Sequence, residues 1–215
     1  MGSADGSIYG FSTSSGNVTW KVDAGSSVSA SAARYGKSAI YATEKGRVLA
    51  LDIVSGSVVW SEETGVNPVG IALADGTAIV ASSNGEVLGL DADSGEIVWR
   101  KVARGRLSSP PAASRGQALV ATHLGEVAVF QARTGTEVQR IELPEEAPAH
   151  LASDGDLLVA ATTKGTIFAM DMEAEEIVWP ATTAGGISSS PLLTEKEVFV
   201  TSRDCAIYAY RRDGK

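Results

Sequence analysis

Six consecutive residues of this chain have the spacing of a metal-binding loop. Asp91-Ala92-Asp93-Ser94-Gly95-Glu96 places oxygen ligands at alternate positions, as the start of a calcium loop does. The bidentate glutamate that such a loop needs at its twelfth position is absent, and related turns in the chain lack the acidic spacing. The same residues suit a turn between two strands. We therefore expect a turn here and no metal site.

A second candidate is the segment Gly36-Lys37-Ser38, which resembles the end of a phosphate-binding loop. The full pattern needs a glycine five residues before the Gly-Lys pair, where this chain has Ser31, and no helical pattern follows. We expect a hairpin turn.

The two histidines, His123 and His150, are 27 residues apart and can form neither a metal pair nor a triad by themselves. Cys205, the single cysteine, cannot form an internal disulfide and is expected to be inert.

The composition narrows the classes of partner. The 215 residues include 44% hydrophobic and 20% charged residues, which indicates a folded domain with a sizeable core. Twenty-six acidic against eighteen basic residues give a net charge of −8, so nucleic acid and anionic membrane surfaces are not expected partners. No apolar run is long enough to span a membrane, and the first residues do not resemble a signal peptide.

The elements that position these residues repeat every 40 residues or so. Three intervals of 40, 39 and 80 residues separate the four tryptophans. The interval of 80 residues spans two repeats, and Gln139 occupies the position where the tryptophan between them would lie. A turn glycine recurs five times with the same period, and Cys205 stands at the position where a sixth would fall. These turn residues are Gly6, Gly46, Gly85, Gly125 and Gly165.

Each unit contains four short runs rich in β-branched residues, separated by glycine turns. Residues 48–52 and 58–60 are examples, and no sustained helical periodicity occurs. Four strands in about 40 residues predict an all-β protein, a β-propeller of four-stranded blades. The expected units are residues 4–43, 44–82, 83–122, 123–161 and 162–202, with a partial unit at 203–215. His150 falls on the expected innermost strand and would face the central channel.

The segment from Ala50 to Trp60 reads A-x-D-x-x-[ST]-G-x-x-x-W. This resembles the tryptophan docking motif of the PQQ-like, or quinoprotein-type, β-propeller repeats. The segment 89–99 matches with glycine in the alanine place, whereas 10–20, 129–139 and 169–179 each keep only part of the motif. The resemblance covers nearly the whole chain.

We interpret the motif as a structural docking device, in which a large flat indole covers the neighbouring blade. A small residue leaves room for the ring, a glycine permits the tight turn and an aspartate caps it. The expected docking residues are Trp20, Trp60, Trp99, Trp179, Gly16, Gly56, Gly95, Gly135, Ala50, Asp52, Asp91, Ala169 and Asp171.

The resemblance implies a function only in outline, because the repeat family includes both the outer-membrane assembly lipoprotein BamB and PQQ-dependent alcohol dehydrogenases. We expect a non-catalytic scaffold that binds protein partners through its loops, either BamB-like or the ectodomain of a sensor. The family implies a periplasmic or cell-envelope location. The alternative is a fragment of a PQQ-dependent dehydrogenase, but no adjacent Cys-Cys pair, calcium site or catalytic aspartate is matched. We therefore expect no cofactor.

The repeat count also suggests an incomplete ring. The strand that opens the motif occurs six times and the tryptophan strand five, whereas family rings of eight blades would need roughly 320 residues. We hypothesise a fragment, or an arc whose open edges self-associate. An engineered or metagenomic fragment without a native task fits the same pattern.

Two surface features complete the set of candidates. Glu173, Glu175 and Glu176, one unit after Glu145-Glu146, predict a solvated acidic rim, with docking of a basic partner as the alternative. Asn17-Val18-Thr19 is a formal glycosylation sequon on a turn.

Overall fold

Every regular element in the described chain is a β-strand. The computed structural model describes residues 1–28, 30–107 and 109–214, and twenty-one strands lie within them. Ser108, in the small-residue stretch Leu107-Ser108-Ser109-Pro110, lies outside the described residues. The strands are short because glycine turns interrupt each alternating apolar run after five to seven residues in most cases.

Within the described residues, six antiparallel sheets follow one another along the chain. The first has two strands, β1 (Ser7–Phe11) and β2 (Val18–Asp23), and the last has three, β19 (Leu192–Leu193), β20 (Glu197–Thr201) and β21 (Ile207–Arg211). The four sheets between them have four strands each: β3 (Ala33–Tyr35), β4 (Ser38–Ala42), β5 (Arg47–Asp52), β6 (Val58–Glu63); β7 (Pro68–Ala74), β8 (Thr77–Ser82), β9 (Glu86–Asp91), β10 (Ile97–Val102); β11 (Ala112–Ser114), β12 (Gln117–Ala121), β13 (Glu126–Gln131), β14 (Glu137–Glu142); β15 (Ala149–Ser153), β16 (Leu157–Thr162), β17 (Thr166–Asp171) and β18 (Glu176–Thr182).

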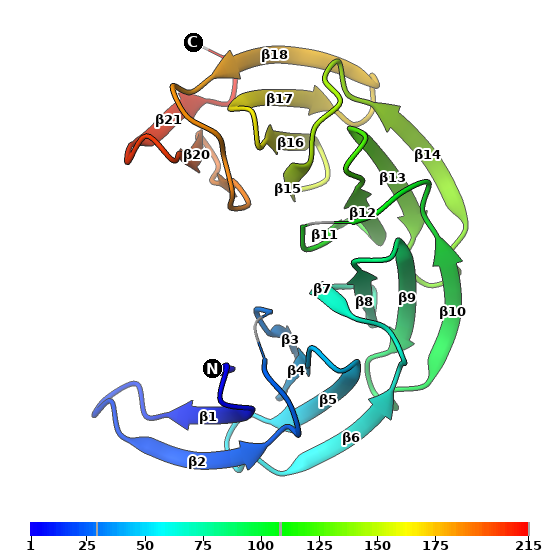
Figure 1. Ribbon diagram of the computed structural model, residues 1–215, viewed down its shortest axis with the longest axis vertical. Helices are drawn as coiled ribbons and strands as arrows, with labels where there is room; N and C mark the ends of the chain where they lie inside the picture. Colours follow the sequence, from blue (N-terminus) through cyan, green and yellow to red (C-terminus); the bar gives the residue numbers. More distant parts are fainter. Residues whose placement is uncertain (29, 108, 215) are drawn as a thin grey trace.

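The sheets stand side by side around an open centre. Figure 1 shows the first strand of each four-stranded sheet innermost and the last outermost, with neighbouring strands paired in chain order. A gap separates β1 and β2 from β20 and β21. The predicted all-β propeller architecture is therefore confirmed, and the described residues form an arc of it.

The sequence units and the sheets are out of phase. The unit expected at 44–82 contains β5 and β6 of one sheet together with β7 and β8 of the next. Each unit counted from its turn glycine thus links two neighbouring sheets through the chain.

The core is divided among the seams between sheets. Five clusters of buried apolar side chains each join two neighbouring sheets. On β5, Leu49 and Leu51 pack with Ile8 of the preceding sheet, whereas Val48 and Ala50 pack toward the following sheet. This period-two alternation buries both faces. A single sheet would expose both, so its stability depends on its neighbours.

Candidate functional site

Each tryptophan lies on the outermost strand of its sheet and reaches a turn of the next sheet. Trp60 on β6 is 8% exposed, and its indole Nε1 donates a hydrogen bond to the carbonyl oxygen of Ala92 at 3.0 Å. This bond crosses a seam and satisfies two buried polar groups. Three other seams have the same bond, from Trp20 to Ile53 at 3.0 Å, from Trp99 to Ala132 at 2.7 Å and from Trp179 to Arg212 at 2.7 Å.

The face of each indole covers a glycine in the turn that accepts the bond. Gly95 has a φ of +81°, and a β-carbon there would lie 2.5 Å from the Trp60 ring. Glycine is therefore required both for the left-handed backbone and for the close approach. Gly56 and Gly135 lie in the same way against Trp20 and Trp99. Gly16 keeps the turn conformation, with a φ of +72°, but has no neighbouring indole.

A small residue lies opposite each tryptophan on the adjacent strand of its own sheet. Ala50 is paired with Trp60, and Ala169 with Trp179. Glycine takes this place in the other two pairs, Gly10 with Trp20 and Gly89 with Trp99, and a β-carbon at either glycine would overlap the ring.

Aspartates hold the accepting turns in shape. The Oδ1 of Asp52 accepts hydrogen bonds from the backbone N–H of Val54 at 3.1 Å and of Ser55 at 2.8 Å, and from the Ser55 hydroxyl at 2.9 Å. Asp91 is bonded in the same way to the next turn, and Asp171 accepts two backbone N–H groups. These bonds, above all those from the serine backbone N–H groups, lower the pKa of Asp52 and Asp91. Among the described residues no three His, Cys, Asp or Glu side chains are placed to hold a metal ion.

One seam departs from this arrangement in three respects at once. Gln139 on β14 occupies the position that tryptophan has in the other sheets, and its partner on β13 is Val129 instead of a small residue. The turn that would receive an indole has Glu175 instead of glycine, and Glu175 keeps the left-handed backbone with a φ of +58°. Where the indole is missing, both the space and the glycine that serve it are missing too.

His150 lies on β15, an innermost strand, but its side chain belongs to a seam. It pairs with Ala161 on β16, and directly paired residues share one face of a sheet. Ala161 packs in the cluster that joins β15–β18 to β19–β21. Nδ1 of His150 is buried without a hydrogen-bond partner in the described part of the chain. Burial, with a smaller contribution from the charge of Arg203, lowers the pKa of His150.

The other candidate residues lie in separate sheets. Gly36 has a positive φ in the turn between β3 and β4, as the hairpin interpretation of its segment requires. His123, after β12, accepts a hydrogen bond on Nδ1 from the Arg106 backbone N–H at 3.1 Å. Cys205 is an exposed free thiol before β21. No arrangement for nucleophilic catalysis links these residues in the sheets described.

The two acidic runs lie at opposite ends of their strands. Glu145 accepts a hydrogen bond from Thr162 at 2.8 Å and pairs with Lys164 at 3.7 Å, next to the start of β17. Glu173 and Glu175 follow the end of β17. They cannot act as one continuous acidic surface, although the sequence places them in successive units.

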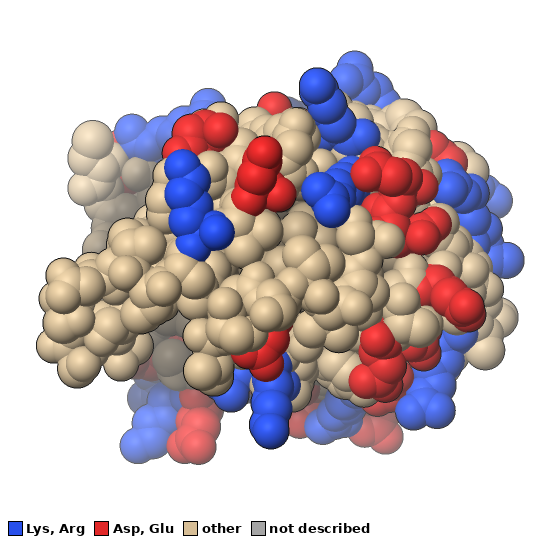
Figure 2. All heavy atoms as spheres, turned by 90° about the horizontal axis from the view of Figure 1, so that it is seen from below, with Lys and Arg blue, Asp and Glu red and all other residues tan. Residues whose placement is uncertain are grey.

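Charged groups also bridge sheets at the rim, which the sequence pattern does not reveal. Arg115 pairs with Asp156 at 2.6 Å, Arg212 pairs with Asp154, and the Tyr35 hydroxyl donates to Asp93 at 3.0 Å. Figure 2 shows acidic and basic side chains intermingled along both rims on the face in view. That face presents no large area of a single charge sign.

The described part of the chain contains no helix with the length and apolar character needed to cross a bilayer.

Comparisons with known proteins agree with this geometry. A family model described as outer membrane protein assembly factor BamB matches residues 1–70, 65–138 and 123–215. The curated outer membrane protein assembly factor BamB of Burkholderia pseudomallei (strain K96243) is 32% identical over 106 residues, which are 49% of this chain and 28% of that relative. The match thus spans less than a third of the relative's length.

Solved structures share the fold. BamB from Moraxella catarrhalis superposes with a TM-score of 0.81 at 19% identity, over 99% of this chain and 69% of that one. The computationally designed protein Ika8 superposes with a TM-score of 0.87 at 17% identity, over 98% and 66%. Because the family model matches the chain from end to end, and because indoles dock successive sheets as the motif requires, the chain belongs to the PQQ-like β-propeller family whose model is described as outer membrane protein assembly factor BamB.

Proposed function

We propose that the chain is a non-catalytic scaffold that binds protein partners in outer-membrane protein assembly and needs no cofactor. The observation that carries this proposal is the family match across residues 1–215, supported by the curated BamB relative. The seams favour such a role, because docked indoles fix the sheets and leave the loops on a rigid frame for contact. A cell-envelope location is part of the proposal.

A shallow pocket at one end of the sheet β11–β14 is a candidate contact site for this role. It has a volume of about 310 Å³ and lies between the turn before β13 and the segment after β14. Leu124 is 47% exposed at this pocket, and acidic side chains surround it. The lining residues are Leu124, Gly125, Glu126, Glu142, Leu143 and Glu146. An apolar side chain flanked by lysine or arginine on a partner loop fits this chemistry.

Binding of the full chain to a purified, membrane-reconstituted outer-membrane protein assembly machinery tests the proposal. We expect a saturable interaction that Leu124→Asp weakens at least about tenfold, as loss of a central interface contact does. Val54→Asp is the matched control, since Val54 is 84% exposed on a turn at the opposite ends of the strands. The absence of binding at micromolar concentrations would refute the scaffold function. Equal binding by both variants would refute the pocket as the contact site.

The enzymatic and sensor alternatives stay predictions of the family resemblance. Incubation of the chain with PQQ and calcium separates the first from the scaffold. A quinone absorbance band that co-elutes with the protein, with calcium-dependent dye reduction, would overturn the non-catalytic proposal.

A further inference from the structure

A pocket of about 320 Å³ lies where the turns of three neighbouring sheets meet. Tyr35, at the end of β3, and Arg133, in the turn after β13, form the walls that come from the two outer sheets. The middle sheet, β7–β10, supplies the rest from the turn after β7 and from the end of β9. This pocket lies at the opposite ends of the strands from the pocket around Leu124.

Three carboxylates line this pocket, and each has an oxygen without a hydrogen bond to the described residues. The Asp75 side chain makes no hydrogen bond or ion pair there, and a β-carbon at Gly116 of the following sheet would lie 2.5 Å from its Oδ2. Asp91 is bonded to its own turn through Oδ1 only. Asp93 accepts a hydrogen bond from Tyr35 on Oδ2 only.

A buried hydroxyl in the same pocket also has no partner. Thr77 is 4% exposed, and its hydroxyl makes no hydrogen bond among the described residues. Thr77 on β8 pairs with Asp91 on β9, so the two side chains share one face of the sheet. Buried polar groups are normally hydrogen-bonded. An unpartnered hydroxyl beside free carboxylate oxygens indicates a ligand that brings several donors.

The repeat itself does not require this acidic set. Of the four complete sheets in the described chain, only β7–β10 has acidic residues at all three positions. The following sheet has Arg115, Gln131 and Arg133 at the equivalent places, since strand pairing aligns Gln131 with Asp91. The pocket is therefore a feature of one sheet and not of the docking motif.

The donors and acceptors of the pocket match a primary ammonium group on an apolar stem. The carboxylates are not placed to hold one metal ion in the described structure. An ammonium group has three N–H donors and no acceptor, which suits three oxygen acceptors around it. Val98 is 51% exposed in the wall and can cover the methylene groups of a stem. Arg133 can donate to a carbonyl oxygen at the pocket's edge.

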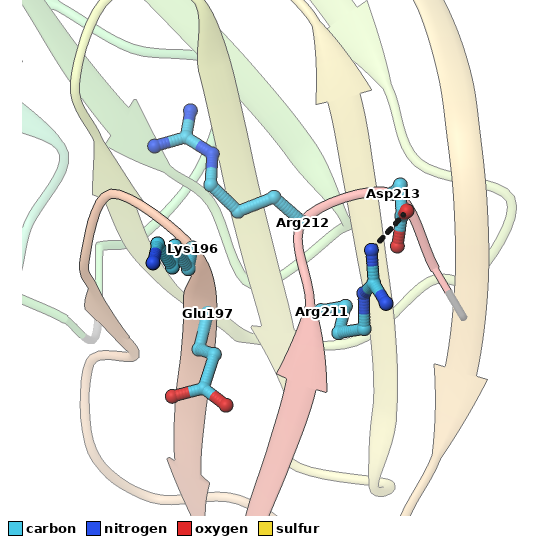
Figure 3. Close-up of a pocket in the computed structure, with 5 residues that line it drawn as sticks. All are labelled: Lys196, Glu197, Arg211, Arg212 and Asp213. Atoms are coloured by element: carbon cyan, nitrogen blue, oxygen red, sulfur yellow. Dashed lines mark hydrogen bonds and ion pairs between the residues drawn. The ribbon is translucent and has the colours of Figure 1, made fainter.

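A larger cavity, of about 580 Å³, does not offer such unpaired groups. It is lined in part by Arg211 and Arg212. Figure 3 shows Arg211 turned toward Asp213, with which it pairs at 3.0 Å. Arg212 pairs with Asp154 of the preceding sheet. Ion pairs within the chain thus already satisfy both arginines of this cavity.

We propose that the pocket between Tyr35 and Arg133 binds the side chain of a lysine on a partner protein. The ammonium group lies among Asp75, Asp91 and the Thr77 hydroxyl, and the stem lies over Val98. Arg133 donates to a backbone carbonyl oxygen of the partner. This is a second contact site, and it depends neither on the contact at Leu124 nor on a role in outer-membrane protein assembly.

Titration of the ¹⁵N-labelled full chain with Nα-acetyl-L-lysine N-methylamide tests the proposal by NMR. We expect saturable shifts of the backbone amides of residues 75–77 and 91–98, with a Kd of about 1–10 mM for so small a probe. The norleucine analogue, which has the stem without the ammonium group, should cause no saturable shift. Butylamine should bind at least about threefold more weakly, because it has no carbonyl oxygen for Arg133.

Variants of the chain separate binding from stability. Thr77→Val should weaken binding of the lysine probe at least about fivefold without lowering the thermal stability, because the hydroxyl has no partner in the free chain. Asp75→Asn should weaken it by a similar factor. Glu96→Gln removes the same charge from an exposed position of the same sheet, outside the pocket, and should change the affinity less than twofold.

Three results would overturn the proposal. One is the absence of a saturable shift with the lysine probe at about 50 mM. Another is an unchanged affinity in both Thr77→Val and Asp75→Asn. The third is equal affinity for butylamine and the lysine probe, which would assign the pocket to a free amine instead of a protein side chain.

Discussion

Tryptophan combines a flat ring with an N–H donor, and the seams use both. The ring of Trp99 covers Gly135, and its Nε1 satisfies the carbonyl of Ala132 in the next sheet. Phenylalanine could supply much of the ring area but not the donor. Leaving a buried carbonyl without its hydrogen-bond donor costs roughly 1–3 kcal/mol of folding free energy.

Trp99→Phe should therefore lower the free energy of unfolding by about 2 kcal/mol, through the unpaired Ala132 carbonyl and the smaller ring. Urea denaturation monitored by circular dichroism measures this loss. Trp20→Phe is the control, because its bond to Ile53 is exposed and water can replace the donor. An equal loss in both variants would show that burial of the bond is not what matters.

His150 should make stability depend on pH. Burial lowers its pKa in the folded state, so the unfolded chain takes up the proton first as the pH falls below about 6.5. Stability should then decrease as the pH falls from about 7 toward the lowered folded pKa, by at most about 1.4 kcal/mol per pH unit for one group. The carboxylate contributions from Asp52 and Asp91 are lost at lower pH, below about 3.8, and do not overlap this range.

Urea denaturation at a series of pH values between 5 and 8 tests this dependence. His150→Leu should flatten the profile. A profile that is unchanged by His150→Leu would place the responsible group elsewhere.

At this scale the sequence predicted the positions of docking residues better than their contacts. The period marks Trp60, Gly95 and Ala50, because sterics force these residue types to recur. It could not identify the carbonyl that accepts the indole hydrogen bond, since a backbone acceptor leaves no trace in side-chain identity. The nearly constant spacing between each tryptophan and the next turn glycine is the one signal that points to it. His150 was expected to face the central channel because it falls on an innermost strand. Strand pairing instead puts it on the same sheet face as Ala161, which packs in a seam between sheets.

At the scale of the elements, one seam is held by apolar packing without an indole. β14 and β18 border it, and its cluster contains Val129, Ile141 and Phe168. The joint change at Val129, Gln139 and Glu175 indicates that the docking motif works as a set. Such sets give strongly non-additive mutational effects.

Gln139→Trp alone should destabilise the protein by about 1–3 kcal/mol, because the ring meets Val129 and a glutamate backbone without room for it. In a background with Val129→Ala and Glu175→Gly, the same change should stabilise by about 2 kcal/mol. Urea denaturation of the single, double and triple variants measures this coupling. Equal effects of Gln139→Trp in both backgrounds would refute the idea that the three positions form one docking unit.

The strands themselves were predicted well from their short alternating runs, but the division into sheets was not. The unit 44–82 supplies strands to two sheets, and no local pattern marks the point at which one sheet ends and the next begins. Within the sheets only consecutive strands pair, so the boundary is marked solely by the absence of pairing between β6 and β7, which strand propensity does not encode.

At the scale of the whole molecule, the arc has two different ends. One presents β1 and β2, and the other presents the uncovered face of β19 to β21 (Figure 1). We propose that these open ends make the isolated chain self-associate, as the repeat count suggested. Unpaired edges and exposed apolar faces favour that behaviour.

Ile207→Lys should reduce this association, because a charge on the uncovered face opposes its burial. Sedimentation velocity over a range of protein concentrations gives the measure. Val54→Lys, at an exposed turn residue outside that face, should associate like the parent chain. Concentration-independent sedimentation of the parent chain as a monomer would contradict self-association through the ends.

The direction of the indole bonds also affects how the chain matures during synthesis. Trp60 must wait for Ala92 and Trp99 for Ala132, so each partner leaves the ribosome 32 or 33 residues later. At translation rates of roughly 5–20 residues per second, this delay is about 2 to 7 seconds. A newly emerged sheet therefore spends seconds with its ring unanchored, and a nascent-chain chaperone that recognises aromatic side chains would meet each tryptophan once, in order from Trp20 to Trp179.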